Sequence, residues 1–152
     1  MGNSVMVIDG TCMLDVAWGP ALAEKGLQGT RVVYADDALL YIKDQAYDAI
    51  VLEPRISPRN ECRHGELEAM ARMGVKDPLE FGIKILEVTR NGSANRGTPV
   101  CIYTGCDPKH DDFLPNAGNF FLGKGADYFF YKPKISLSEI VEHLAQVLNG
   151  KM

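Results

Sequence analysis

Short apolar runs alternate with segments of helical periodicity along the whole chain, and this alternation is the feature that most constrains the fold. We expect strands at residues 5–9, 31–35, 47–52, 98–103 and 128–131. Continuously apolar strands separated by helices are typical of a parallel sheet, because parallel strands need long crossover connections. The sequence therefore predicts an α/β protein in which five strands and about five helices form a three-layer sandwich.

Local signals mark where several helices begin and end. Residues 11–25 form a helical stretch that Gly26 closes, and Pro20 within it predicts either a kink or a new helix start. Asp77-Pro78-Leu79-Glu80 combines an N-cap acid with a proline at the first helical position and a glutamate at the third. Ser136-Leu137-Ser138-Glu139 is a capping box ahead of an amphipathic run, which predicts the best-defined helix of the chain.

Length and charge narrow the classes of protein that fit this chain. With 152 residues, 46% of them hydrophobic, we expect residues 1–152 to form one globular domain. The net charge of −4, without a dense cluster of Lys and Arg, argues against direct binding of nucleic acid. No basic export segment opens the sequence, and no apolar run approaches the roughly 18 residues of a membrane span. We therefore expect a soluble, cytoplasmic protein without a membrane partner.

Residues 54–76 break the alternation of strands and helices. This stretch is polar and contains Pro, Arg and Asn, with one plausible short helix at residues 65–73. We interpret it as an insertion over one edge of the sheet.

Three of the predicted strands end in a polar side chain. The third strand runs directly into Glu53, the fourth into Thr104 and the fifth into Lys132. In an open parallel sheet, ligands and chemistry collect outside the carboxyl ends of the strands. An acid, a hydroxyl and an amine at one sheet edge predict a small polar site that suits a phosphoryl group or a metal-bound carboxylate.

Four segments carry a resemblance to a known family that covers nearly the whole chain. They are Val7-Ile8-Asp9, Tyr47-Asp48-Ala49-Ile50-Val51-Leu52-Glu53, Thr98-Pro99-Val100-Cys101-Ile102-Tyr103-Thr104 and Gly125-Ala126-Asp127-Tyr128-Phe129-Phe130-Tyr131-Lys132-Pro133. Together they resemble the receiver domain of bacterial two-component response regulators. The resemblance implies a flavodoxin-like fold with strand order 2-1-3-4-5 and a switch in which an aspartyl phosphate forms at the end of the third strand.

The resemblance also implies site residues, and two of them depart from the family pattern. In that family the first strand ends in two acids that hold Mg²⁺, the third in the phosphorylated Asp, the fourth in Ser or Thr and the fifth in Lys. Asp9 keeps one of the metal-binding acids, while Gly10 replaces the other. Glu53 stands where the phosphorylated Asp belongs, and Thr104 and Lys132 match the family.

These departures weaken the chemistry of the family. Glu53 is one methylene longer than Asp, which moves its oxygens by about 1 Å, and such a displacement costs on the order of 10²-fold in rate. The loss of the second acid at Gly10 leaves Asp9 and Glu53 as weak ligands for Mg²⁺. We therefore expect impaired phosphorylation and no required cofactor, with Mg²⁺ as the one candidate.

The family resemblance further implies a switch residue and an interaction face. Phe129 occupies the aromatic position that turns inward in the family when the Thr, here Thr104, moves toward the phosphate. The face corresponds to residues 116–124, 128–131 and 136–148. Its aromatic side chains are either docking residues or core residues, and we expect the last two of them to lie on opposite faces of their strand: Phe120, Phe121, Phe129 and Tyr131.

Our leading hypothesis is a stand-alone, atypical receiver-like signalling module that is not an enzyme. It would act through protein–protein interaction, with a histidine kinase or a downstream effector as partner, and a second copy of this chain is a further candidate. A permanent charge on Glu53, paired with Lys132, would fix an activated-like state. The same pair is equally compatible with a salt bridge that has no signalling role.

Two alternatives belong to other classes. One is a working Mg²⁺-dependent phosphoacceptor that takes a phosphoryl group on Glu53 or another acid. The other is a metal or small-ligand sensor, in which Cys62, His64, Cys106 and His110 converge as a zinc site, although neither Cys–His pair has the usual spacing. Free thiols and surface histidines are the simpler interpretation of these four residues.

Overall fold

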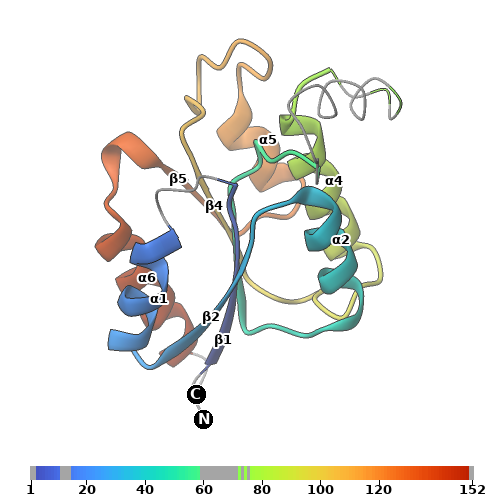
Figure 1. Ribbon diagram of the computed structural model, residues 1–152. Helices are drawn as coiled ribbons and strands as arrows, with labels where there is room; N and C mark the ends of the chain where they lie inside the picture. Colours follow the sequence, from blue (N-terminus) through green and yellow to red (C-terminus); the bar gives the residue numbers. More distant parts are fainter. Residues whose placement is uncertain (1–2, 11–14, 59–71, 73, 75, 151–152) are drawn as a thin grey trace.

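A computed structural model describes residues 3–10, 15–58, 72, 74 and 76–150. Its five strands form one parallel sheet in the order β2-β1-β3-β4-β5, which confirms the predicted architecture (Figure 1). The strands are β1 (Asn3–Ile8), β2 (Leu27–Val32), β3 (Ala49–Leu52), β4 (Val100–Thr104) and β5 (Tyr128–Tyr131).

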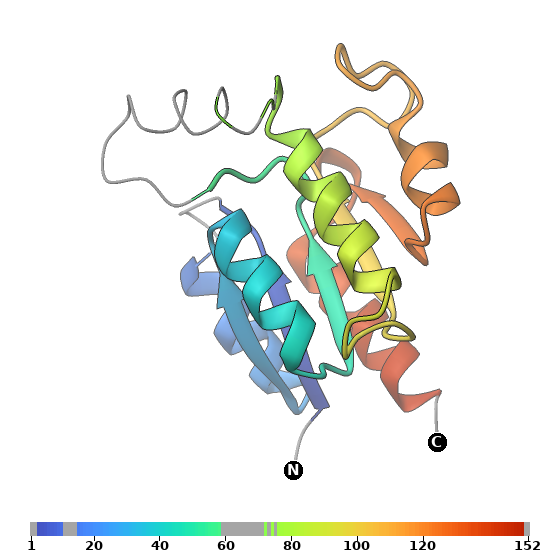
Figure 2. The same cartoon turned by 90° about the vertical axis from the view of Figure 1, so that its right-hand side faces the viewer.

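Helices cover both faces of this sheet. One face carries α1 and α6, and the other carries α2, α4 and α5 (Figures 1 and 2). The helices are α1 (Asp15–Glu24), α2 (Ala35–Asp44), α4 (Leu79–Arg90), α5 (Ala117–Gly123) and α6 (Leu137–Asn149), and a short 3₁₀ turn, η2 (Lys132–Lys134), follows β5. Within the described part of the chain, no helix has the length and apolar character needed to cross a membrane.

The hydrophobic core has two halves, one on each face of the sheet. Along β1, Met6 and Ile8 pack toward α2 and α4, whereas Val5 and Val7 pack toward α1 and α6. This alternation follows from the strand period of two residues. Because the side chains on both faces of the sheet are buried, the central strands are continuously apolar in sequence.

The predicted second strand was wrong by several residues. We expected it at residues 31–35, but β2 begins at Leu27 and α2 already begins at Ala35. Gly26 has a φ of 72°, which ends the preceding helix in one residue and lets the strand start at once. The middle of β2 is exposed and polar because β2 is an edge strand, so its sequence does not show a buried run.

Helix starts agree better with the local signals. The Ser136 hydroxyl accepts the Glu139 N–H at 3.2 Å, as the capping box predicts. α4 begins at Leu79 with Pro78 at its N-cap, one residue later than predicted, but the Asp77 carboxylate still accepts the Leu79 N–H at 2.8 Å and Glu80 accepts the Asp77 N–H at 3.4 Å. Pro20 lies inside α1, which continues across it as one helix, so of the two predicted alternatives the new helix start was wrong.

The chain that follows β3 packs tightly against the core. Pro54 and Ile56 are buried, and the Ala35 N–H at the start of α2 donates to the Ser57 carbonyl at 2.8 Å. On α4, a Cβ added to Gly82 would lie 2.3 Å from Pro54 Cα, so the helix backbone sits directly against this proline. The contact fixes the direction in which the chain leaves β3. The predicted short helix at residues 65–73 lies outside the described residues, apart from Arg72.

Candidate functional site

The register of the sheet brings the predicted polar residues to one edge. Ile8 pairs with Leu52, Leu52 with Ile102, and Thr104 with Tyr131. Backbone hydrogen bonds extend this order past the strand ends, since the Asp9 N–H donates to Val32 and the Glu53 N–H to Ile8, at 3.0 and 2.8 Å. Parallel strands therefore place four side chains together, which we call the charged cluster: Asp9, Glu53, Thr104 and Lys132.

Lys132 lies between the two carboxylates of the charged cluster. Its Nζ is 3.0 Å from Asp9 Oδ2 and 3.2 Å from Glu53 Oε2. The Asp9 and Glu53 residues are only 1% and 7% exposed, so one ammonium compensates two buried acids. Burial alone would lower the pKa of Lys132, but the two carboxylates outweigh it and raise that pKa above its ordinary value. Lys132 therefore stays protonated.

Glu53 is held by neutral donors as well. Thr104 Oγ1 donates to Oε1 at 2.6 Å, the Arg55 N–H donates to the same oxygen at 3.1 Å, and the Gly105 N–H donates to Oε2 at 3.3 Å. Burial raises the pKa of Glu53, and it outweighs the opposing effects of Lys132 and these hydrogen bonds. Both oxygens of the carboxylate are thus held by donors. Its burial still disfavours the charged form.

Gly10 and Phe129, the other residues carried over from the family, lie outside this contact network. Gly10 is exposed and, as a glycine, adds no second acid to the edge. Phe129 is half-buried and stacks on Phe121 with ring centroids 6.4 Å apart. Its ring packs against the core on the side of α5.

One expectation about β5 was wrong. Phe129 and Tyr131 do not lie on opposite faces, because residues two apart along a strand point the same way. Phe129 packs with the core half under α2 and α4, whereas Tyr128 and Phe130 pack with the other half.

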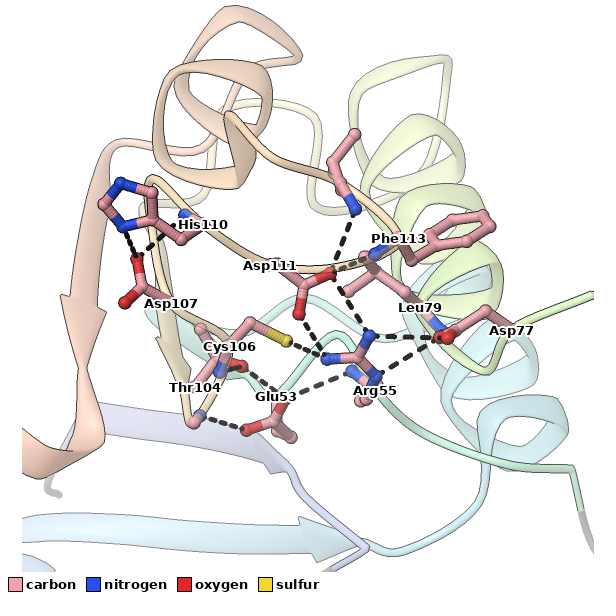
Figure 3. Close-up of polar contacts among 12 residues, drawn as sticks. Glu53, Arg55, Asp77, Leu79, Thr104, Cys106, Asp107, His110, Asp111 and Phe113 are labelled. Carbon is pink, nitrogen blue, oxygen red and sulfur yellow. Dashed lines mark hydrogen bonds and ion pairs between the residues drawn. The ribbon is translucent and has the colours of Figure 1, made fainter.

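Arg55 is the main residue of this region that the sequence did not reveal (Figure 3). Its guanidinium contacts Asp111 at 2.9 and 3.3 Å and Asp77 at 3.2 and 3.3 Å, and it donates to Cys106 Sγ at 2.6 Å. We call these four residues the Arg55 cluster. The hydrogen bond from Arg55 lowers the pKa of Asp111 and the pKa of Arg55 itself is raised, chiefly by Asp111. Asp77, Cys106 and Asp111 lie 22 to 56 positions from Arg55 in sequence, so no local pattern links them to it.

Two of the four residues of the predicted zinc site, Cys106 and His110, lie within the described part of the chain. Cys62 and His64 lie outside the described residues. Cys106 is buried, its N–H donates to Thr104 Oγ1 at 3.0 Å, and burial raises the pKa of its thiol. The His110 side chain is 79% exposed beside Asp107. In the part of the chain that can be inspected, no group of three or more His, Cys, Asp or Glu side chains is arranged to hold a metal.

The charged cluster offers Mg²⁺ a poor set of ligands. Mg²⁺ requires near-octahedral oxygen coordination and usually keeps several waters. Here both carboxylates are buried, each already contacts the Lys132 ammonium, and Gly10 supplies no side-chain oxygen. A metal would share these carboxylates with the ammonium and would lack a second acid from the first strand.

Fold and sheet edge together define a class, the flavodoxin-like α/β fold of receiver domains. A scan of protein-family models finds no match to this chain, and a search of the curated proteins finds none. Solved receiver domains, however, superpose over nearly its full length. A Francisella response regulator receiver domain aligns with a TM-score of 0.70 and 20% identity, covering 99% of this chain and 100% of the other.

Two further structures show the same similarity. The receiver domain of a Pseudomonas aeruginosa sensor histidine kinase, solved with magnesium in its active-site cleft, has a TM-score of 0.68 and 17% identity over 99% of both chains. A CheY-like receiver domain protein from Methanospirillum hungatei has a TM-score of 0.69 and 15% identity over 99% of this chain and 97% of the other. The chain therefore has the receiver fold of two-component signalling.

Proposed function

We propose that this chain is an atypical receiver-like signalling module that acts by binding a protein partner, without phosphorylation of Glu53. The observation that carries the proposal is the placement of the Glu53 carboxylate, which accepts the Thr104 hydroxyl at 2.6 Å and lies 3.2 Å from Lys132 Nζ. The longer acid at position 53 thereby brings a permanent negative charge to this edge, while Gly10 supplies no second acid for a metal.

The state of Thr104 supports a fixed arrangement. In the family that the sequence resembles, the corresponding hydroxyl moves toward the phosphorylated acid when the domain is activated. Here Thr104 is fully buried and already donates to Glu53 at 2.6 Å. A charge-assisted hydrogen bond of this length is among the stronger ones in proteins. We infer that Glu53 holds Thr104 in a permanent, activated-like position.

The partner is a protein, with a histidine kinase or a downstream effector as the leading candidates and a second copy of this chain as another. The face formed by α5, β5 and α6 offers apolar contact area. Leu122 is 44% exposed, while Phe120 and Tyr131 are half-buried and Phe121 belongs to the core. Partly exposed aromatic residues beside an exposed leucine are common in docking surfaces.

The test is incubation of the protein with acetyl phosphate and Mg²⁺, followed by intact mass measurement. We expect no stoichiometric phosphorylation of the wild-type chain. The matched control is the double variant Glu53→Asp, Gly10→Asp, which restores both acids of the family pattern and should gain one phosphoryl group. The second change requires a small shift of the backbone, because a Cβ at Gly10 would lie 3.3 Å from the Val33 carbonyl oxygen, so the fold of the double variant is checked by circular dichroism first.

A second candidate function is a working Mg²⁺-dependent phosphoacceptor. It is favoured by one observation, the convergence of Asp9, Glu53, Thr104 and Lys132 at a single sheet edge. If the wild-type chain gains one phosphoryl group in the experiment above, this candidate replaces the proposal.

A further inference from the structure

The loop between β4 and α5, residues 105–116, begins directly against Glu53 and Thr104 of the charged cluster. Its first residue donates its N–H to Glu53 Oε2 at 3.3 Å, and the loop then passes over the carboxylate (Figure 3). Glu53 is 7% exposed, Cys106 is 3% exposed and Thr104 is fully buried. We therefore expect a reagent or partner to reach these groups only when the loop moves.

Arg55 fastens this loop to two other segments. Its backbone N–H donates to Glu53 at the exit of β3. One side of its guanidinium forms a two-point contact with Asp111 in the loop, and Asp77 at the start of α4 forms a second two-point contact. Guanidinium–carboxylate forks are directional, so the three segments have fixed relative positions while both contacts persist.

Asp111 is the attachment point on the loop side. Its side chain is 9% exposed, and Oδ2 also accepts the N–H groups of Phe113 and Leu114, both at 3.0 Å. The same carboxylate thus shapes the turn of the loop and binds Arg55. Leu114 adds apolar contact with the core. Loss of the Arg55 contact would leave the loop with its own turn but with a weaker hold on the sheet edge.

We propose that Arg55 is a latch that closes the β4–α5 loop over the charged cluster, and that breaking the Arg55–Asp111 contact opens access to Cys106 and Glu53. The latch consists of Arg55 and its contacts with Asp111, Asp77 and Cys106. It does not depend on whether Glu53 is phosphorylated, so it goes beyond the function proposed above and can fail independently of it.

Cys106 gives the latch a direct readout. Its Sγ is the third partner of the Arg55 guanidinium, so alkylation of this thiol reports loop opening. The test measures the rate of N-ethylmaleimide labelling at Cys106 by peptide mass spectrometry in the wild type, in Arg55→Gln and in Asp111→Asn. A charge-assisted contact of this kind corresponds to about a tenfold change in the open population, so both variants should label about ten times faster.

Two controls keep the result interpretable. Arg96→Gln makes the same substitution at an exposed arginine outside the latch and should leave the rate within about twofold, as surface substitutions usually have small effects. Cys101, fully buried in β4, reports global unfolding. Faster labelling of Cys106 at an unchanged Cys101 rate supports the latch. Equal acceleration of both thiols, or no acceleration of Cys106, overturns it.

Discussion

Two buried polar clusters lie at opposite ends of the same sheet, and they differ in charge. The charged cluster at the carboxyl ends of the strands contains two carboxylates and one ammonium. At the amino ends, fully buried Asn95 donates from Nδ2 to the carbonyls of Ile42 and Gln45, at 2.8 and 2.6 Å. Its Oδ1 accepts the Tyr47 N–H at 2.8 Å and the Thr98 hydroxyl at 3.1 Å.

The two clusters differ in what they contribute to the stability of the fold. Asn95 uses its hydrogen-bonding capacity on neutral groups, most of them backbone, and so joins α2, β3 and β4 without burying a charge. The charged cluster retains a desolvation cost that raises the pKa of Glu53. Buried ion pairs are often no more stabilising than apolar residues of similar size. The charged cluster carries this cost and the Asn95 contacts at the other end of the sheet do not, so stability alone does not account for the buried charges.

The largest loss of stability is expected for a substitution at Asn95. Asn95→Ala leaves two carbonyls and the Tyr47 N–H without their buried partner, so the free energy of unfolding should fall by about 3 kcal/mol. Urea denaturation measures this loss. The matched control is Asn91→Ala at the exposed end of α4, which should stay within about 0.5 kcal/mol. Similar losses in both variants would refute the central role given to Asn95.

Lys132→Met should produce the next largest loss, about 2 kcal/mol at pH 7. Removing one partner of a fully buried pair costs about 3–5 kcal/mol, and the 20% exposure of the Lys132 side chain reduces this figure. The variant removes the ammonium that Asp9 and Glu53 share, so the pKa of Glu53, already raised by burial, should rise further. The loss should therefore be present above that pKa and shrink as the pH falls and Glu53 becomes protonated. Denaturation at pH 7 and pH 4 tests this, and an equal loss at both would contradict it.

Gly82→Ala tests how firmly Glu53 is positioned. In an exposed helix this change stabilises by up to about 1 kcal/mol. Here the new Cβ would lie 2.3 Å from Pro54 Cα, so we expect a net loss of about 1–2 kcal/mol as helix and proline move apart. Gly123→Ala is the control, because no atom lies within 4 Å of its added Cβ. Thermal unfolding should place the two variants on opposite sides of the wild type.

The smallest effect concerns acid stability. Asp111 has a lowered pKa in the folded state, so its contribution is present above the ordinary Asp value near 4 and is lost as the pH falls through the folded pKa. Arg55→Gln removes the main cause of that shift and should cost about 1 kcal/mol at pH 7 and less at pH 2.5. Urea midpoints at the two pH values measure the difference. A constant difference would show that Asp111 does not carry it.

Local signals predicted the parts of the fold that depend on neighbours in sequence. The bounds of β5 and the cap at Ser136 follow from a short apolar run and a capping box. β2 was misplaced because an edge strand does not need a buried sequence. The meeting of Glu53, Thr104 and Lys132 followed from the rule that parallel strands end together.

Long-range polar contacts could not be predicted in the same way. Arg55 and Asp111 are 56 positions apart and lie in segments of irregular structure, so no periodicity links them. Asn95 sits in a turn, where asparagine is common for local reasons. The second contact of Lys132, with Asp9, required the register of four strands, from β1 through β3 and β4 to β5.

The position of Lys132 has a further consequence for signalling. On the proposed function, a site whose charges all belong to the polypeptide responds neither to the supply of divalent cations nor to the activity of a kinase and a phosphatase. Such a protein cannot be reset once it is made. The quantity that its partner senses would then be the number of copies present, which makes synthesis and degradation the steps at which the message is adjusted.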